Sequence, residues 1–506
     1  MQRFHRVAKG TLANILGQLL NVGSQLILLP ILLRYWGNQT YGEWLALSAM
    51  VSYLSTLDLG MQTYVVNRLN QCYSLNQMDE YTRVLHSGLL VNVAIPIAGL
   101  CAVLPFFFNA PLTRWLQLHD TSPADASWVA ALLSFQMVLA IVYGLLAGIY
   151  RTVHEYARGQ MIANLRFFLN LILTIAIAYA GGRLRGLAIM QLALLLTACV
   201  FVFIDLRRRR PEIQVGFSQA DWRLGVQFIG PSLMFLGIQI LSALVIQGSV
   251  LMVSAMFGAG VLVVFASLRT LANLIKQAAA TVQHALWPEF TTLDAEAKAA
   301  TMRTLHLLGA KLSMTIAVCS AAFLVCMGDR VVALWTDGRV PFDFPLMIGF
   351  LMQACSQAHW CTSSVLISAC NRQQTLLRWT AASALAGFLI GSVAAHWFGV
   401  AGFVFGLALA DGVLCGLALP WFACRMIGES RMRFLREVTL RSAVLLVTTY
   451  GAVKLIVPLA GAAGVRGFLY TGILTCAFGA AAAYAVALNR FERDRVNAAV
   501  AGMLDR

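Results

Sequence analysis

Charged residues are scarce in this chain. They make up 12% of its 506 residues, whereas hydrophobic residues make up 59%, and a soluble protein of this size would carry about twice that charged fraction. The apolar residues come in runs of roughly 20 to 25, the length that crosses a hydrocarbon core as a helix. We therefore interpret the chain as an all-α polytopic membrane protein in which no stretch requires a soluble domain.

Several catalytic signatures are also missing. There is no Gly-x-x-x-x-Gly-Lys loop, which argues against ATP hydrolysis by that route, and no His-Glu-x-x-His, Cys-x-x-Cys or clustered Cys/His metal site. The cysteines are scattered, mostly in apolar segments, where they serve as small hydrophobic side chains. We expect no cofactor and no metal. No external loop is long enough for a catalytic domain, so we do not expect an enzyme.

The apolar runs predict about fourteen transmembrane helices joined by short loops. They lie near 11–35, 42–66, 84–108, 127–150, 160–180, 185–206, 224–248, 259–284, 306–328, 344–367, 374–396, 399–424, 438–458 and 466–488.

The distribution of Lys and Arg predicts the orientation of these helices, because cytoplasmic loops carry the excess of positive charge. With the N-terminus in the cytoplasm, the cytoplasmic loops hold about four times as many Lys and Arg as the opposite side. The formal charge of +15 then reflects topology rather than nucleic-acid binding. The opposite side holds only Arg34, Arg114, Arg183, Arg185, Arg330, Arg339 and Arg466. Both termini are therefore predicted to be cytoplasmic.

A weak internal repeat predicts two pseudo-symmetric halves. At a shift of 221 residues, Tyr35-Trp36-Gly37 matches Met256-Phe257-Gly258, and Gln18 matches Gln239. Repeated halves are a common build of secondary transporters, with the substrate site between them. We predict a six-helix bundle over 1–210, a second over 211–426, and two additional helices with a cytoplasmic tail over 427–506.

The same shift aligns two polar stripes that differ in charge. Steps of four, three and seven residues keep side chains on one helical face, and in a bilayer such a face must meet protein or water. Arginine's planar fork suits phosphate oxygens, so the second stripe predicts a pathway for an anionic substrate. The alternative is that Arg269 pairs with a carboxylate and Lys276 reaches the cytoplasmic surface. The stripes are Ser48, Ser52, Ser55 and Gln62, and Arg269, Asn273, Lys276 and Gln283.

Other polar residues in the apolar segments are further candidates. Carboxamides suit sugar hydroxyls or cavity water, or they simply bond neighbouring helices. Arg166 and Arg34 are secondary cations, with structural or interface roles as the alternatives. Asp58 and Asp411 either bind a proton or cation that drives transport, or neutralise Arg269. The carboxamide candidates on the first and seventh spans are Asn14, Gln18, Asn21, Gln25 and Gln239.

Four short motifs of this chain are Gly37-Asn-Gln-Thr-Tyr41-Gly42-Glu-Trp44, Leu57-Asp58-Leu59-Gly60, Asn67-Arg68 and His284-Ala-Leu-Trp287-Pro288-Glu289. They resemble motifs of bacterial polysaccharide transporters, the Wzx-type O-antigen flippases of the multidrug/oligosaccharidyl-lipid/polysaccharide (MOP) exporter superfamily. The resemblance implies a MATE-like fold in the bacterial inner membrane, with two six-helix bundles that alternate between inward- and outward-open states. It also implies transport of undecaprenyl-diphosphate-linked oligosaccharide repeat units to the outer leaflet.

Under this resemblance, Arg269 and Lys276 bind the diphosphate, with Arg166 and Arg34 secondary. The expected partners are the lipid-linked oligosaccharide, membrane lipids, a polysaccharide polymerase and chain-length proteins, and no nucleic acid. One alternative is a cation-coupled multidrug exporter of the same superfamily, in which carboxylates rather than cations dominate the cavity. Another is a polysaccharide polymerase or ligase, which usually needs a substantial external loop.

Overall fold

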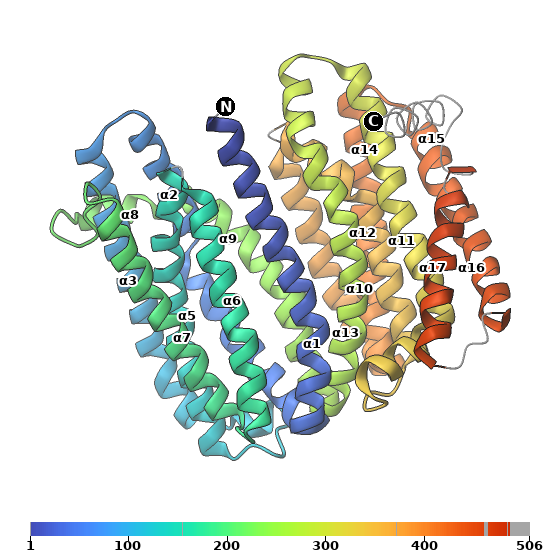
Figure 1. The fold of residues 1–506 in the computed structure, drawn as a ribbon, viewed down its shortest axis with the longest axis horizontal. Coiled ribbons are helices and arrows are strands. Elements are labelled where there is room, and N and C mark those ends of the chain that lie inside the picture. The colour runs from blue at the N-terminus through green and yellow to red at the C-terminus, as the bar shows by residue number, and fades with distance from the viewer. Residues whose placement is uncertain (1, 154, 371, 460–463, 483, 486–506) are drawn as a thin grey trace. The chain divides into compact units, whose positions relative to one another are not determined.

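The computed structural model describes residues 2–153, 155–370, 372–459, 464–482 and 484–485. Within these ranges the elements are helices and no strand occurs, which confirms the predicted all-helical class (Figure 1). Residues 486–488 of the last predicted span and the predicted cytoplasmic tail lie outside the described residues.

The chain divides into two compact units, Met1–Val263 and Val264–Arg506. The first unit contains α1 (Gln2–Ser52), the 3₁₀ helix η1 (Tyr53–Asp58), α2 (Met61–Ser74), α3 (Met78–Asn109), α4 (Leu112–Trp115), α5 (Pro123–Thr152), α6 (Tyr156–Tyr179), α7 (Leu184–Arg209), α8 (Trp222–Gln227), α9 (Ile229–Ala243), the π-helix η2 (Leu244–Gly248) and the start of α10 (Ser249–Ala295).

The second unit holds the rest of α10. It continues with α11 (Ala299–Thr336), α12 (Phe344–Ala369), α13 (Gln373–Ala410), the π-helix η3 (Asp411–Cys415), α14 (Gly416–Ile427), α15 (Arg431–Phe434), the π-helix η4 (Leu435–Leu440), α16 (Arg441–Leu459) and α17 (Gly464–Ala482).

The first unit extends beyond the predicted repeat boundary at 210–211. Helix α8 packs on α3, and α9 packs on α2, so the segment that begins the second predicted half joins the first unit by its contacts. The boundary at 210–211 separates sequence repeats, whereas the boundary at 263–264 separates groups of residues that contact one another, so the two need not coincide. The predicted division into 1–210, 211–426 and 427–506 therefore stays a prediction.

Three glycines bend long helices where the sequence suggests short loops. Gly37 has φ 75° and ψ 175°, Gly258 has φ 79° and ψ 174°, and Gly399 has φ 63° and ψ −155°. Positive φ is accessible to glycine without the steric cost that a Cβ imposes. Gly37 and Gly258 stand 221 residues apart and share nearly the same conformation, which supports the internal repeat at this point.

Nine helical segments among the described residues are long and apolar enough to cross a membrane. Three of them, Leu16–Tyr73, Gln239–Gln283 and Gln374–Ile427, each run through one of the kinks and so combine two predicted spans. The protein is thus a multi-pass membrane protein. The number of fourteen spans and the two six-helix bundles stay predictions.

The predicted span over 42–66 is not one continuous helix, which corrects the sequence analysis. After α1 the chain forms the 3₁₀ turn η1, and Leu59 and Gly60 then adopt left-handed conformations with φ 52° and 73°. The polar stripe from Ser48 to Gln62 therefore does not follow a single helical face. Glycine at position 60 permits the break, and the carboxylate of Asp58 accepts the backbone N–H of Gln62 at the start of α2.

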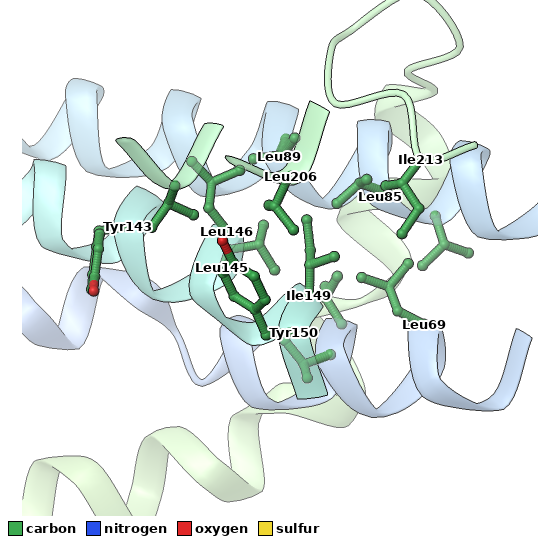
Figure 2. Packing of buried hydrophobic residues seen from close by; sticks show 14 of the residues in the cluster. Leu69, Leu85, Leu89, Tyr143, Leu145, Leu146, Ile149, Tyr150, Leu206 and Ile213 are labelled. Atoms are coloured by element: carbon green, nitrogen blue, oxygen red, sulfur yellow. The ribbon is translucent and has the colours of Figure 1, made fainter. Parts of the chain in front are cut away.

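An apolar core holds the helices of the first unit together. Leu69 of α2, Leu85 and Leu89 of α3, and Ile149 of α5 are buried in one cluster with Leu206 of α7. Figure 2 shows these side chains meeting between the helices. The cluster joins α2, α3, α5 and α7, and so fixes the frame on which the polar residues of this unit stand.

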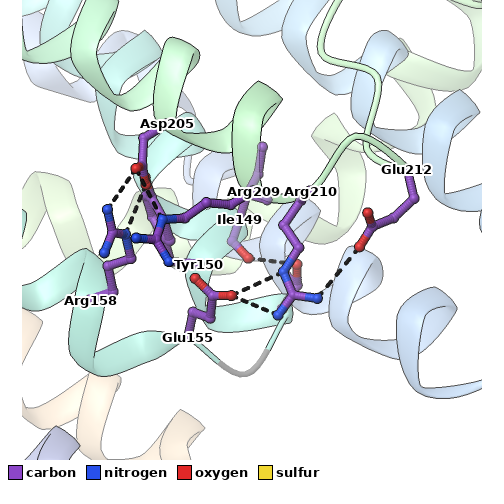
Figure 3. A network of polar contacts seen from close by, with 9 residues as sticks. Ile149, Tyr150, Glu155, Arg158, Asp205, Arg209, Arg210 and Glu212 are labelled. Carbon is purple, nitrogen blue, oxygen red and sulfur yellow. Dashed lines mark hydrogen bonds and ion pairs between the residues drawn. The ribbon is translucent and has the colours of Figure 1, made fainter.

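An ion-pair network joins two helices of the same unit (Figure 3). The guanidinium of Arg158 donates to both oxygens of Asp205 at 2.6 and 2.9 Å, and Arg210 donates to Glu155 at 2.6 Å. These bonds tie the start of α6 to the end of α7. Arg210 is the last of four consecutive arginines, Arg207–Arg210, that follow the sixth predicted span, and it therefore has a structural role.

A buried ion pair joins α11 to the segment that leads into α16, within the second unit. Lys311 of α11 lies 3.1 Å from Glu437 of η4, and their side chains are only 2% and 6% exposed. Arg441, one turn later, lies 3.2 Å from the same carboxylate oxygen. Because a lone buried charge is costly, each group here depends on the others. The pair fixes α16, one of the two predicted additional helices, against α11.

We predict that Glu437→Leu destabilises the protein by about 3–5 kcal/mol, because it leaves the Lys311 ammonium buried without its partner. The double variant Lys311→Met/Glu437→Leu should recover most of that loss, since no uncompensated ammonium remains. Thermal unfolding of the purified protein in detergent measures both. A double variant as unstable as the single variant would contradict this account.

Candidate functional site

A polar cavity of about 430 Å³ lies inside the first unit. Its polar lining comes from the segment between α1 and α2 and from the end of α9 with η2, and its apolar lining comes mainly from Met137, Ala140 and Ile141 of α5. Among the residues that the structure describes, no Lys or Arg lines it. The polar lining residues are Ser52, Ser55, Asp58, Gln62, Gln239 and Gln247.

Asp58 is the acidic group of this cavity and is only 5% exposed. Its Oδ1 accepts the backbone N–H of Gln62 at 3.0 Å, and its Oδ2 accepts the side-chain amide of Gln239 at 3.5 Å. The Oε1 atom of Gln239 has no hydrogen-bond donor among the described residues. The site therefore presents a carboxylate and a spare amide oxygen, the ligand types that bind a proton, a hard cation or a hydroxyl.

The first predicted stripe contributes to this cavity despite the helix break. Ser52, Ser55 and Gln62 line it, whereas Ser48 is half-buried with no partner for its hydroxyl in the described part of the chain. A Cβ on Gly144 of α5 would come within 2.4 Å of the Gln62 amide oxygen. Glycine at this position lets α5 approach the cavity closely.

The second predicted stripe lies on the part of α10 that follows the Gly258 kink, where the helix continues without a further break. The Lys276 amine donates to the Gln353 side chain of α12 at 3.0 Å, and the Arg269 guanidinium lies 5.1 Å from the Phe265 ring centroid. Lys276 therefore engages a neighbouring helix rather than extending to the surface. Asn273 and Gln283 are half-buried on the same helix.

Asp411 provides a carboxylate in the second unit, at the first residue of the π-helical turn η3. Its Oδ2 accepts the Ser356 hydroxyl at 2.6 Å and the Trp360 indole N–H at 3.1 Å. It also interacts electrostatically with Lys276. The second unit thus pairs the Lys276 ammonium with the Asp411 carboxylate, whereas the first unit has Asp58 and neutral amides.

The two secondary cations, Arg166 and Arg34, belong to the first unit and lie in different surroundings. Arg166 of α6 stacks 5.1 Å from the ring centroid of Tyr143, and its Nε has no acceptor among the described residues. Arg34 is exposed three residues before Gly37. The contact of Arg166 with Tyr143 agrees with its structural alternative, and the substrate roles of Arg166 and Arg34 stay predictions.

The carboxamides of α1 lie along the helix and do not converge on one enclosed site. Asn14 accepts the Tyr156 hydroxyl at 3.3 Å, and Gln25 donates to Asn21 at 3.2 Å. Gln18 and Asn21 are exposed. In the described ranges, no group of three His, Cys, Asp or Glu residues lies close enough to hold a metal.

Glu43 organises a cluster that sequence analysis did not assign. Its buried carboxylate accepts the backbone N–H groups of His119 and Asp120 at 2.6 and 2.8 Å, together with the Thr121 hydroxyl and the Gln39 amide. We call these five residues the Glu43 cluster. It attaches the loop before α5 to α1, six residues beyond the Gly37 kink.

The same loop is bonded to α10 near the matching kink. The side chain of Gln117 donates to the carbonyl of Ala255 at 2.6 Å, three residues before Gly258. A Cβ on Gly42 would lie 2.2 Å from the carbonyl oxygen of Ala259, so the two kinked helices touch through their backbones. One loop therefore holds both repeat-related kinks of the first unit, which gives the Gly37–Trp44 motif a physical role.

The sequence analysis missed two groups of polar residues, and only the group on α12 could have been found from its spacing. Gln353, Ser356 and Trp360 follow steps of three and four along α12, the same polar spacing that revealed the α10 stripe. Glu43 accepts a hydrogen bond from Gln39 four residues away, but its other partners lie more than 70 positions away in a loop. Only the fold could identify them.

Comparison with known proteins finds solved structures that share this fold. No family model matches the chain, and neither does any curated protein. Among solved structures, the lipid II flippase MurJ in an inward closed conformation has a TM-score of 0.73 at 12% identity, covering 96% of this chain and 99% of that one. An inward-facing MATE family multidrug resistance transporter of the MOP superfamily has a TM-score of 0.69 at 15% identity, covering 81% and 94%.

A third similar structure is the MATE multidrug transporter DinF-BH in complex with R6G. Its TM-score is 0.59 at 12% identity, covering 84% of this chain and 97% of that one. At such identities the likeness establishes the fold: this chain has the architecture shared by these flippase and drug-transporter structures.

We predict that Glu43→Gln opens the loop before α5, because one amide oxygen cannot satisfy all four donors. Unsatisfied buried donors cost about 1–3 kcal/mol, which corresponds to roughly 5- to 150-fold faster local amide exchange. Hydrogen–deuterium exchange of the peptide over 116–122 measures the effect. Glu80→Gln is the matched control, since Glu80 is exposed and pairs with Arg68. Equal exchange in both variants would refute the role of Glu43.

Proposed function

We propose that this protein is a flippase that moves undecaprenyl-diphosphate-linked oligosaccharide repeat units from the inner to the outer leaflet of the bacterial inner membrane. It works by alternating access, has both termini in the cytoplasm, and serves surface polysaccharide synthesis. Its transporter fold, shared with a lipid II flippase structure, supports this proposal. The motif resemblance to Wzx-type flippases supports the choice of substrate.

The observation that carries the proposal is the pair of cations on one face of α10. Arg269 and Lys276 stand seven residues apart, which is two helical turns. Charges in a membrane-spanning helix cost roughly 2.5–3.5 kcal/mol each, so they are rarely retained without a function. A guanidinium binds two phosphate oxygens side by side, and an ammonium adds a point charge. Together they suit a diphosphate, with Arg166 and Arg34 in secondary roles.

The sugar portion requires donors and acceptors rather than charge. Carboxamides provide both. We assign this role to the amides of α1, α9 and α10, namely Asn14, Gln18, Asn21, Gln25, Gln239, Asn273 and Gln283. A polysaccharide polymerase and chain-length proteins are the partners that would use the translocated product.

Two carboxylates are available to couple transport to an ion or proton gradient. Asp58 faces the polar cavity of the first unit, and Asp411 accepts two hydrogen bonds in the second. An uncompensated carboxylate in a membrane-spanning segment is energetically costly, so binding of a proton or a cation to it is favourable. We assign ion coupling to these two residues.

A multidrug exporter driven by cations is the second candidate function. The polar cavity around Asp58 favours it, because that cavity has a carboxylate and no lining cation. In an exporter of this kind the substrate would be a cationic drug, and loss of Asp58 would sensitise cells to it. In a flippase, loss of Arg269 or Lys276 would abolish transport of the lipid-linked substrate.

We predict that Arg269→Ala abolishes surface polysaccharide in cells that depend on this chain, without lowering its abundance in the membrane. Lys276→Gln should have the same effect. Gel analysis of surface polysaccharide and immunoblotting of membranes measure the two quantities. Lys298→Ala is the matched control, because Lys298 is exposed and pairs with Glu296. Intact polysaccharide in Arg269→Ala cells, together with new drug sensitivity in Asp58→Asn cells, would favour the exporter instead.

A further inference from the structure

A second cavity, of about 400 Å³, lies within the second unit. Its walls come from α12, α13, η3, α14, α15 and η4, and nearly every lining residue is apolar. Two walls are open to the surface of the unit, since Val413 and Leu417 are 49% and 60% exposed. Both belong to a segment that is long and apolar enough to span the membrane, so hydrocarbon chains of lipids are the natural contents.

One cation stands at this apolar cavity. The guanidinium of Arg431 lies 4.3 Å from the ring centroid of Trp421, and both residues line the cavity. Stacking of a guanidinium on an indole fixes its plane while its N–H groups remain able to donate. Tryptophan at the end of a membrane helix is typical of the membrane–water interface.

Arg431 differs from its basic neighbours in its charge balance. Arg433 lies 3.7 Å from Glu429, and Arg436 lies 3.8 Å from Glu437. Among the residues that the structure describes, no carboxylate lies within ion-pair distance of Arg431. The other polar lining residue, His359, already bonds the Thr439 hydroxyl at 2.8 Å. Arg431 is therefore the group in this cavity that remains available to an anion.

We propose that this cavity, which we call the Arg431 groove, binds an anionic phospholipid. One acyl chain fills the apolar groove, and the phosphate accepts hydrogen bonds from the Arg431 guanidinium. The groove lies beside a loop that is predicted to be cytoplasmic, where anionic lipids attract basic residues. This lipid is a bound component of the protein and not the cargo, so the site goes beyond the proposed transport function.

The charge pattern favours this occupant over others. A zwitterionic lipid would fill the groove equally well, but its headgroup adds a cation close to the guanidinium and so gains less from it. A soluble anion would use Arg431 and leave the apolar wall uncovered. An anionic phospholipid satisfies both parts of the site at once.

The test is native mass spectrometry of the delipidated full-length protein with dioleoylphosphatidylglycerol or dioleoylphosphatidylcholine. Wild type should retain phosphatidylglycerol preferentially, and Arg431→Gln should lower that retention about fivefold, the factor that corresponds to about 1 kcal/mol per basic residue at an anionic surface. Arg436→Gln is the matched control: it removes the same charge nearby without lining the groove, and should leave retention unchanged.

A second variant separates the groove from the charge. Leu417→Trp fills the exposed wall while leaving Arg431 in place, and should reduce retention of both lipids. Size-exclusion chromatography verifies that each variant is folded. Equal retention of the two lipids by wild type, or an Arg431→Gln variant that retains phosphatidylglycerol as wild type does, would overturn the proposal. The assay contains no oligosaccharide lipid, so either result leaves the flippase proposal to its own test.

Discussion

The satisfaction of backbone hydrogen bonds is the constraint on which this structure depends. A bilayer offers no water to exposed N–H and C=O groups, so the chain must remain helical wherever lipid surrounds it. Each departure from the helix then needs a local compensation. Gly37 and Gly258 supply the conformations for two kinks, and the loop before α5 is bonded to the helix at each of them. The carboxylate of Asp58 accepts the N–H of Gln62 at the break before α2.

The two candidate carboxylates, Asp58 and Asp411, lie where the helices are irregular. Asp58 ends a 3₁₀ turn, and Asp411 begins a π-helical turn. Irregular turns inside membrane helices are frequent at functional sites, because they free backbone groups and redirect side chains. Arg269 and Lys276 are the contrast, since they stand on the regular helix α10. Positive charge is therefore presented from a rigid element, and the two carboxylates stand at points where the backbone departs from the regular α-helix.

The all-helical, multi-pass class was predictable from the sequence, because long apolar runs report directly on the bilayer. The kinks at Gly37, Gly258 and Gly399 were predicted as short loops and not as bends within long helices. The matched positions of Gly37 and Gly258 were visible in the repeat. The break at Gly60 was not, since hydropathy averages over it. The partners of Glu43 and Lys276 were also unpredictable, because they depend on which helices pack together. The predicted substrate roles still rest on residue chemistry and resemblance rather than on contacts.

The most direct measurement is translocation by the purified protein in liposomes that contain undecaprenyl-diphosphate oligosaccharide. A soluble lectin that recognises the sugar binds only molecules in the outer leaflet. With active protein present, the lectin should progressively capture nearly the whole pool, and liposomes with Arg269→Ala protein should yield only the fraction that starts outside. If wild-type protein also yields only the fraction of oligosaccharide lipid that starts in the outer leaflet, the proposed flippase activity is contradicted.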